Sequence, residues 1–239
     1  MKLAIKTIIN GAEIPYTRVL EWERRRALVV LRKLGVKPAG RDLAGMRQQL
    51  AERKQALGAA GMMRILRREL ALSGPLATLT AALSCGRRRF SVTELVMSGG
   101  TAEQFVDWLN ERARINDERS MLAGTPDHYL IRIGANGVQD VVETNGGSPL
   151  AARFFIDYQD LSSLRSPVDP AYPLQVAGVA RSGGGRAIGG VRHQFRNEGT
   201  GFRARLLVEF PLLMLPQVVT GHQWHLASEF SNWIEAAFA

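Results

Sequence analysis

Six short segments with strand-like patterns, followed by one long helical segment, constrain the fold of this chain more than any other feature. Alternating or continuously apolar residues mark the segments at 129–133, 138–143, 153–158, 174–181, 187–195 and 202–210. Glycine-rich turns such as 134–137 and 183–185 separate neighbouring segments, which favours antiparallel hairpins. Pro216 suits the first turn of a final helix of about 20 residues. The pattern predicts a curved antiparallel sheet and a long C-terminal helix.

This order of elements predicts an α+β fold, in which the curved sheet grips the last helix around a cavity. We therefore expect a helix-grip arrangement. An NTF2-like cone is the alternative, because the predicted helix at 101–122 precedes the sheet. The length of the final helix favours the helix-grip arrangement over the cone.

The first 97 residues read as a helical region. Apolar spacing predicts helices at 16–34, 42–57 and 61–72, with Ser73-Gly74-Pro75 ending the third, and a more apolar segment at 76–83. A short strand is expected at 90–97. Ser98-Gly99-Gly100 is the best boundary, so we predict a basic helical region over 1–97 and an α+β domain over 98–239.

Charge is distributed unevenly between these two parts. Residues 1–97 hold 19 Lys and Arg against 7 Asp and Glu, whereas residues 98–239 hold 12 against 15. Binding of nucleic acid through residues 1–97 is therefore one hypothesis.

The single cysteine, Cys85, excludes an internal disulfide framework and a Cys-ligated zinc site, and it favours a reducing cytoplasm. Without 18 consecutive apolar residues, no membrane span is expected.

Three ionisable side chains share one edge of the apolar face of the final helix. At 100° per residue, His222, His225 and Glu229 fall close together, beside the stripe that contains Leu226 and Trp233. His225 and Glu229 are four residues apart, so their side chains can converge. Such a pair suits two ligands of a divalent metal, or a histidine oriented by a carboxylate for acid–base chemistry. Alternatively, His225 and Glu229 have only a structural role and interact with each other at the surface of the helix.

The stretch from His225 to Asn232, His-Leu-Ala-Ser-Glu-Phe-Ser-Asn on a helix that follows a proline, resembles the corresponding stretch of the diacetylphloroglucinol hydrolase family. The resemblance implies a START-like helix-grip fold, a zinc site, and hydrolysis of a carbon–carbon bond between an acyl group and an aromatic ring. It also implies that His225 and Glu229 are metal ligands, which leaves His222 beside the metal or facing the substrate.

The other metal ligands must come from the strands. His128 and Glu143 are the first choice, because they lie at the same end of a predicted hairpin. His222, Tyr158 and Arg153 are the candidates for catalysis or for holding an anionic or phenolic substrate. The function predicted is a zinc-dependent hydrolase of a small organic substrate, with a nucleic-acid-binding protein and a non-catalytic small-molecule carrier as alternatives. Homodimerisation is left open.

Overall fold

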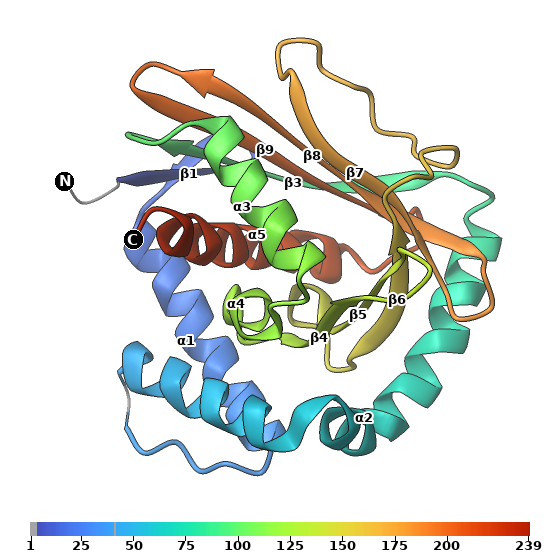
Figure 1. Cartoon of the computed structure of the whole chain (residues 1–239). Coiled ribbons are helices and arrows are strands. Elements are labelled where there is room, and N and C mark those ends of the chain that lie inside the picture. Colours follow the sequence, from blue (N-terminus) through green and yellow to red (C-terminus); the bar gives the residue numbers. More distant parts are fainter. Residues whose placement is uncertain (1–3, 41) are drawn as a thin grey trace.

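The computed structural model describes residues 4–40 and 42–239, and it places nine strands in one curved antiparallel sheet (Figure 1). The order across the sheet is β2-β1-β3-β9-β8-β7-β6-β5-β4. The strands are β1 (Ile5–Ile9), β2 (Ala12–Ile14), β3 (Arg88–Met97), β4 (His128–Ile133), β5 (Gln139–Glu143), β6 (Ala152–Asp157), β7 (Leu174–Arg181), β8 (Ala187–Glu198) and β9 (Gly201–Pro211). The six strands expected in the second half are therefore β4 to β9, joined mostly as consecutive antiparallel neighbours.

The helices lie on the concave side of this sheet and around its edges (Figure 1). They are α1 (Tyr16–Lys33), α2 (Leu43–Leu83), α3 (Ala102–Arg114), α4 (Glu118–Ala123) and α5 (Pro216–Ala237), with a short 3₁₀ turn, η1 (Asn145–Gly147). Helix α5 runs between the sheet and α1, and it also packs against α3, α4 and η1. The expectation of an α+β fold, with a helical N-terminal region and a curved sheet around a long C-terminal helix, is confirmed.

Helix α5 is buried over most of its length because it is enclosed on several sides. Leu226, Phe230, Trp233 and Ile234 are at most 5% exposed and belong to the main hydrophobic core, together with aromatic residues of α3 and the sheet. Pro216 occupies the first turn of the helix, as its fixed φ and missing N–H favour. A helix enclosed in this way can hold polar side chains away from water, which matters for the site described below.

The first strands of the sheet come from the region expected to be helical. Strands β1 and β2 form a hairpin whose turn residues, Asn10 and Gly11, have φ of 53° and 76°. Asn-Gly is the dipeptide that favours such a left-handed turn, so the signal is present in the sequence. Strand β3 then lies between β1 and β9. The boundary predicted after Met97 therefore falls within a continuous sheet.

Helix α2 corrects the prediction that Ser73-Gly74-Pro75 ends a helix. The segment from Leu43 to Leu83 is helical over 41 residues but kinked at Gly58, whose backbone is not helical and which lies between the helices expected at 42–57 and 61–72. Pro75 lies inside the second part of this helix and does not end it. A proline removes one backbone hydrogen bond of the helix. The packing of α2 against β6 and β8 offsets that loss, and the sequence around Pro75 does not reveal this packing.

The helix expected at 101–122 is divided into α3 and α4. Asn116 has φ of 53°, a left-handed conformation that ends α3, and the side chain of Asp117 then caps α4. Thr101 caps α3 with the capping box that its sequence predicts. In the part of the chain that the structure describes, none of the helices is both long and apolar enough to cross a membrane.

A buried lysine lies where α2 meets the loop before β4. The Nζ atom of Lys54 donates hydrogen bonds to the carbonyl oxygens of Leu122 (3.2 Å) and Thr125 (3.4 Å). Burial lowers the pKa of Lys54 from 10.5 to about 7, against the attraction of Asp127 and Glu23. Between pH 7 and pH 10.5, Lys54 therefore carries a proton in the unfolded chain but not in the folded protein.

We expect the free energy of unfolding to rise between pH 7 and pH 10, and Lys54→Met to reduce that rise. The slope from one such group is at most about 1.4 kcal/mol per pH unit. Chemical denaturation of the native protein and of Lys54→Met across this range measures the difference, since the other titrating groups are common to both. Lys37→Met, at an exposed lysine, should keep the native slope. Equal slopes in the native protein and Lys54→Met would contradict the assignment.

Candidate functional site

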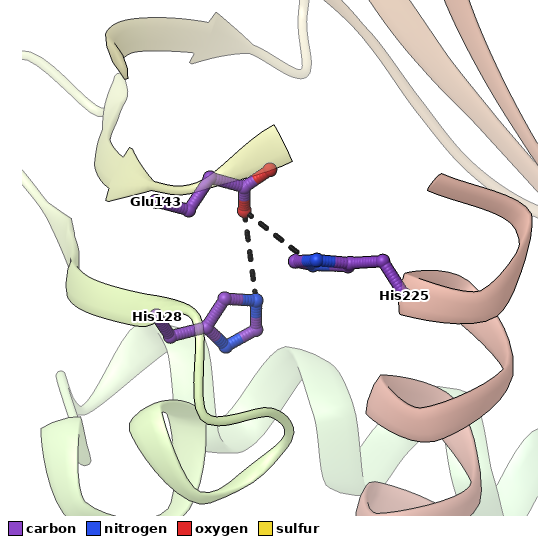
Figure 2. Close-up of side chains that lie close together, drawn as sticks. All are labelled: His128, Glu143 and His225. Carbon is purple, nitrogen blue, oxygen red and sulfur yellow. Dashed lines mark ion pairs between the residues drawn. The ribbon is translucent and has the colours of Figure 1, made fainter. Parts of the chain in front are cut away.

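Two histidines and two glutamates from the sheet and the last helix meet in the interior. His128 begins β4 and Glu143 ends β5, and the two are paired directly across the hairpin. His225 and Glu229 come from adjacent turns of α5. Figure 2 shows His128, Glu143 and His225 pointing toward a common point. All four residues are buried, with exposed fractions between 0 and 9%.

The distances between their side-chain atoms are short. Oε2 of Glu143 lies 3.5 Å from Nε2 of His128 and 3.9 Å from Nε2 of His225 (dashed in Figure 2). Glu229 reaches both imidazoles through different oxygens, with Oε1 at 3.2 Å from Nε2 of His128 and Oε2 at 3.8 Å from Nε2 of His225. One ligand atom from each of His128, Glu143 and His225 lies within 4.8 Å of the other two.

These separations suit a single divalent ion held by His128, Glu143 and His225, with Glu229 beside them. Around a tetrahedral zinc with bonds of about 2.0–2.1 Å, neighbouring ligand atoms are about 3.3–3.5 Å apart. The nitrogen–oxygen separations run from 3.2 to 3.9 Å, which is close to this range, although Glu229 approaches the two imidazoles through different oxygens. Two imidazoles and two carboxylates are also ligand types that zinc accepts.

The tautomer of His128 supports the same interpretation. Its Nδ1 lies 3.1 Å from the carbonyl oxygen of Met121. Because a carbonyl only accepts hydrogen bonds, Nδ1 must carry the proton and donate it. In the neutral ring, Nε2 is then unprotonated and presents its lone pair to the cluster. A backbone carbonyl that fixes the far nitrogen is the usual support of a metal-bound histidine.

His225 is the most isolated of the four side chains. Neither of its ring nitrogens has a hydrogen-bond partner among the described residues, although the side chain is 1% exposed. Leaving a buried polar atom without a partner costs about 1–3 kcal/mol. The ring of His222 stacks on the ring of His225, with 4.7 Å between their centroids. The ring of Trp22 in α1 lies edge-on to His225, with 6.3 Å between the centroids. A ligand at Nε2 would remove part of this penalty.

The protein surroundings favour the neutral forms of Glu143 and His225. Burial, and then the charges of Glu229 and Asp127, raise the pKa of Glu143 well above its usual value. Burial, with smaller effects from His222 and His128, lowers the pKa of His225 well below its usual value. A divalent cation would oppose the first shift, because it stabilises the ionised carboxylate. The cation could also bind a ring nitrogen of His225, because the lowered pKa keeps this imidazole neutral.

A cavity of about 590 Å³ adjoins the cluster between the sheet and α5. Glu143 and Glu229 line it, whereas His128 and His225 lie behind its wall. Most of the wall is apolar, including Leu109, Ile131, Val141, Phe154, Ile156, Val191, Leu226, Phe230 and Trp233. The volume is that of a site for a small organic molecule.

Two of the three residues predicted to act in catalysis face this cavity. His222 and Tyr158 line it, and the Tyr158 hydroxyl donates a hydrogen bond to Oε1 of Gln139 at 3.0 Å. Burial, and then the nearby Glu229 and Glu143, raise the pKa of Tyr158, which keeps its phenol protonated. Burial also lowers the pKa of His222 to about 3, with smaller effects of His193 and His128.

Arg153 is not brought to the site. Its guanidinium forms two hydrogen bonds to the carboxylate of Asp140, at 2.8 and 2.9 Å, and lies over the ring of Phe155. It does not line the cavity. The side chain points to the other face of the sheet from its neighbour Phe154, which lines the cavity wall, as alternation along a strand requires.

His193 is a cavity residue that did not enter the predicted site. It lines the cavity from β8, its ring centroid lies 4.9 Å from that of Phe230 in α5, and its Nδ1 has no partner within the described chain. Burial lowers its pKa to about 3. The signal was available in the sequence, because His193 alternates with Val191 and Phe195 on one face of its strand. Gln139, the partner of Tyr158, carried no comparable signal.

Comparison with known proteins leaves the site to be interpreted from its geometry. No protein-family model matches the chain. No curated protein matches it significantly either.

Proposed function

We propose that this protein is a divalent-metal-dependent hydrolase of a small, largely apolar substrate that carries an acyl group on an aromatic ring. The observation that carries the proposal is the convergence of His128, Glu143, His225 and Glu229 at the wall of a cavity of about 590 Å³. The unpartnered Nε2 of His225 is explained most simply by a ligand that the cluster binds.

Zinc in this position would polarise a carbonyl group and make bound water more acidic. The proposed reaction adds water to the acyl carbon, breaks its bond to the ring carbon, and gives a carboxylic acid and an arene whose ring carbon has gained a proton. Glu143 and Glu229 would hold the ion at the cavity wall, so the reacting carbonyl must approach these two carboxylates. The resemblance of residues 225–232 to the diacetylphloroglucinol hydrolase family suggests this substrate class.

The residues of the cavity would bind and orient the substrate. The aromatic and aliphatic wall suits a flat, apolar ring. His222 stays neutral because its pKa is lowered to about 3, so it has one N–H donor and one acceptor nitrogen for a phenolic hydroxyl. A base with so low a pKa transfers protons poorly near neutral pH. The protonated hydroxyl of Tyr158 is the other cavity group able to hold a proton close to the ring.

Metal titration and an activity assay test the proposal together. After treatment with a chelator, the protein should bind about one equivalent of Zn²⁺ and become more resistant to heat, because the ion binds only the folded state. It should then release acetate from acetylated phloroglucinols, and only in the metal-loaded form. Absence of binding in the micromolar range would exclude the metal centre. Binding without activity on these compounds would exclude the proposed reaction.

A carrier function is the second candidate, and the apolar wall of the cavity favours it. A carrier would bind an aromatic ketone with the same affinity before and after removal of metal, and would not convert it.

A further inference from the structure

The second half of α2 exposes a continuous apolar face, which we call the leucine face. It consists of four residues that are each 56–64% exposed: Leu72, Leu76, Leu79 and Leu83. Their spacing of four, three and four residues places them within roughly 60° on the helix. Large apolar side chains are usually exposed singly, so a row of this kind marks a surface that contacts something else.

A second segment extends the leucine face. Leu213 and Leu215, in the turn between β9 and α5, are 53% and 65% exposed. The backbone N–H of Leu213 donates a hydrogen bond to Oγ of Ser84, directly after Leu83. Two chain segments that are far apart in sequence therefore contribute to the same apolar surface, which is not a property of α2 alone.

Arginines lie at both ends of the leucine face. Arg64, Arg67 and Arg68 precede it and Arg87 follows it, and all four are exposed. None of them forms an ion pair within the described residues, whereas Arg88 pairs with the buried Glu209. Residues 61–90 contain one acidic residue, so the four exposed arginines give the surface a positive charge around its apolar centre.

This combination fits the surface of an anionic membrane better than it fits a second copy of the chain. Two copies paired antiparallel through the leucine face would bring Arg68 of each one close to Arg87 of the other, so like charges would repel. An amphipathic helix with leucines on one side and arginines beside them inserts shallowly among lipid headgroups, and anionic lipids attract its charges. Nucleic acid would use the arginines but would leave the leucines exposed.

We propose that the leucine face, with Leu213, Leu215 and the flanking arginines, docks the protein on the surface of an anionic lipid membrane. The cavity lies directly beneath this surface, since Ala77 of α2 and Met214 of the turn line its wall. Figure 1 shows this half of α2 running along the side of the molecule next to β6. An apolar ligand dissolved in the lipid would therefore reach the cavity over a short path.

Sedimentation of the full-length protein with lipid vesicles tests the proposal. The native protein should sediment with vesicles of phosphatidylcholine and phosphatidylglycerol in a ratio of about two to one, and about tenfold less with phosphatidylcholine alone. Leu76→Gln with Leu79→Gln should weaken binding to the anionic vesicles about tenfold or more. Arg67→Gln with Arg68→Gln should weaken it as well and reduce its dependence on salt.

Matched variants control for loss of apolar side chains and of charge. Val29→Gln with Ile115→Gln replaces residues that are 43% and 47% exposed, in α1 and directly after α3, and Arg18→Gln with Arg25→Gln removes the same charge from α1. Both pairs should bind like the native protein. Leu76→Trp supplies a second measurement, because insertion among lipids should shift its fluorescence to shorter wavelength.

Several results would overturn the proposal. It fails if the native protein does not bind anionic vesicles, or if the leucine and arginine variants bind as the native protein does. A dimer that the leucine variant converts to monomer, without vesicle binding, would identify the surface as an interface between copies. Retention on DNA without vesicle binding would assign the arginines to nucleic acid. None of these results depends on whether the protein binds metal or hydrolyses a substrate.

Discussion

His225→Ala is expected to abolish the binding of divalent metal, with a loss of affinity of at least about 100-fold. Changes to residues that only support a metal ligand already reduce affinity by about 10- to 100-fold, so loss of a ligand should have a larger effect. The native protein should retain the ion through gel filtration, and elemental analysis should find about one ion per chain. The same analysis of His225→Ala should find almost none.

His193→Ala is the matched control, because His193 is also a buried histidine but lies outside the cluster. Both substitutions leave a space of the same size in the interior, so a general loss of stability should affect them similarly. Only the native protein and His193→Ala should gain stability from added Zn²⁺, by about 2.7 kcal/mol at a free concentration 100 times the dissociation constant. Equal metal content in His225→Ala and His193→Ala would refute the assignment of His225 as a ligand.

Gly221→Ala is expected to destabilise the protein strongly, although alanine usually favours a helix by about 1 kcal/mol over glycine. Gly221 lies in α5 where the helix crosses η1, and an added Cβ would overlap the carbonyl of Gly146. Gly146 has φ of 55°, and a Cβ there would in turn overlap the carbonyl of Val218. The backbones of η1 and α5 are in contact at these two glycines. In Gly221→Ala, η1 and α5 must therefore move apart to make room for the new Cβ. Overpacking of this kind costs about 1–3 kcal/mol or more.

The separation should also disturb the cluster, because η1 follows Glu143 directly and Gly221 precedes His222 and His225 on α5. Thermal denaturation should show the loss of stability, and metal titration should show weaker binding than in the native protein. Gly183→Ala is the control, since its Cβ would meet no atom within 4 Å. It should change the free energy of unfolding by no more than about 0.5 kcal/mol. A Gly221→Ala protein as stable as the native one would contradict the close contact between η1 and α5.

The parts of the fold predicted from the sequence are those set by local periodicity. Alternation along β4 to β9 and the turn residues between them are properties of short segments, and so is the apolar stripe of α5. The same periodicity placed His222, His225 and Glu229 on one side of α5 before any contact was known. The hairpin of β4 and β5 then favoured His128 and Glu143, which the structure pairs across the two strands.

Tertiary contacts decided the rest. The sequence around Pro75 favours a break, yet α2 continues to Leu83 and packs against β6 and β8. Strand β3 pairs with β9, which lies more than 100 residues later in the chain. This pairing joins the strands of the two predicted regions, 1–97 and 98–239, in one sheet. Arg153 and Tyr158 looked equivalent as polar strand residues, but Arg153 pairs with Asp140 whereas Tyr158 lines the cavity. Periodicity shows which residues share a face. The burial that leaves the nitrogens of His225 without partners arises only when α1, α5 and the hairpin close around them, because desolvation depends on segments that are distant in the sequence.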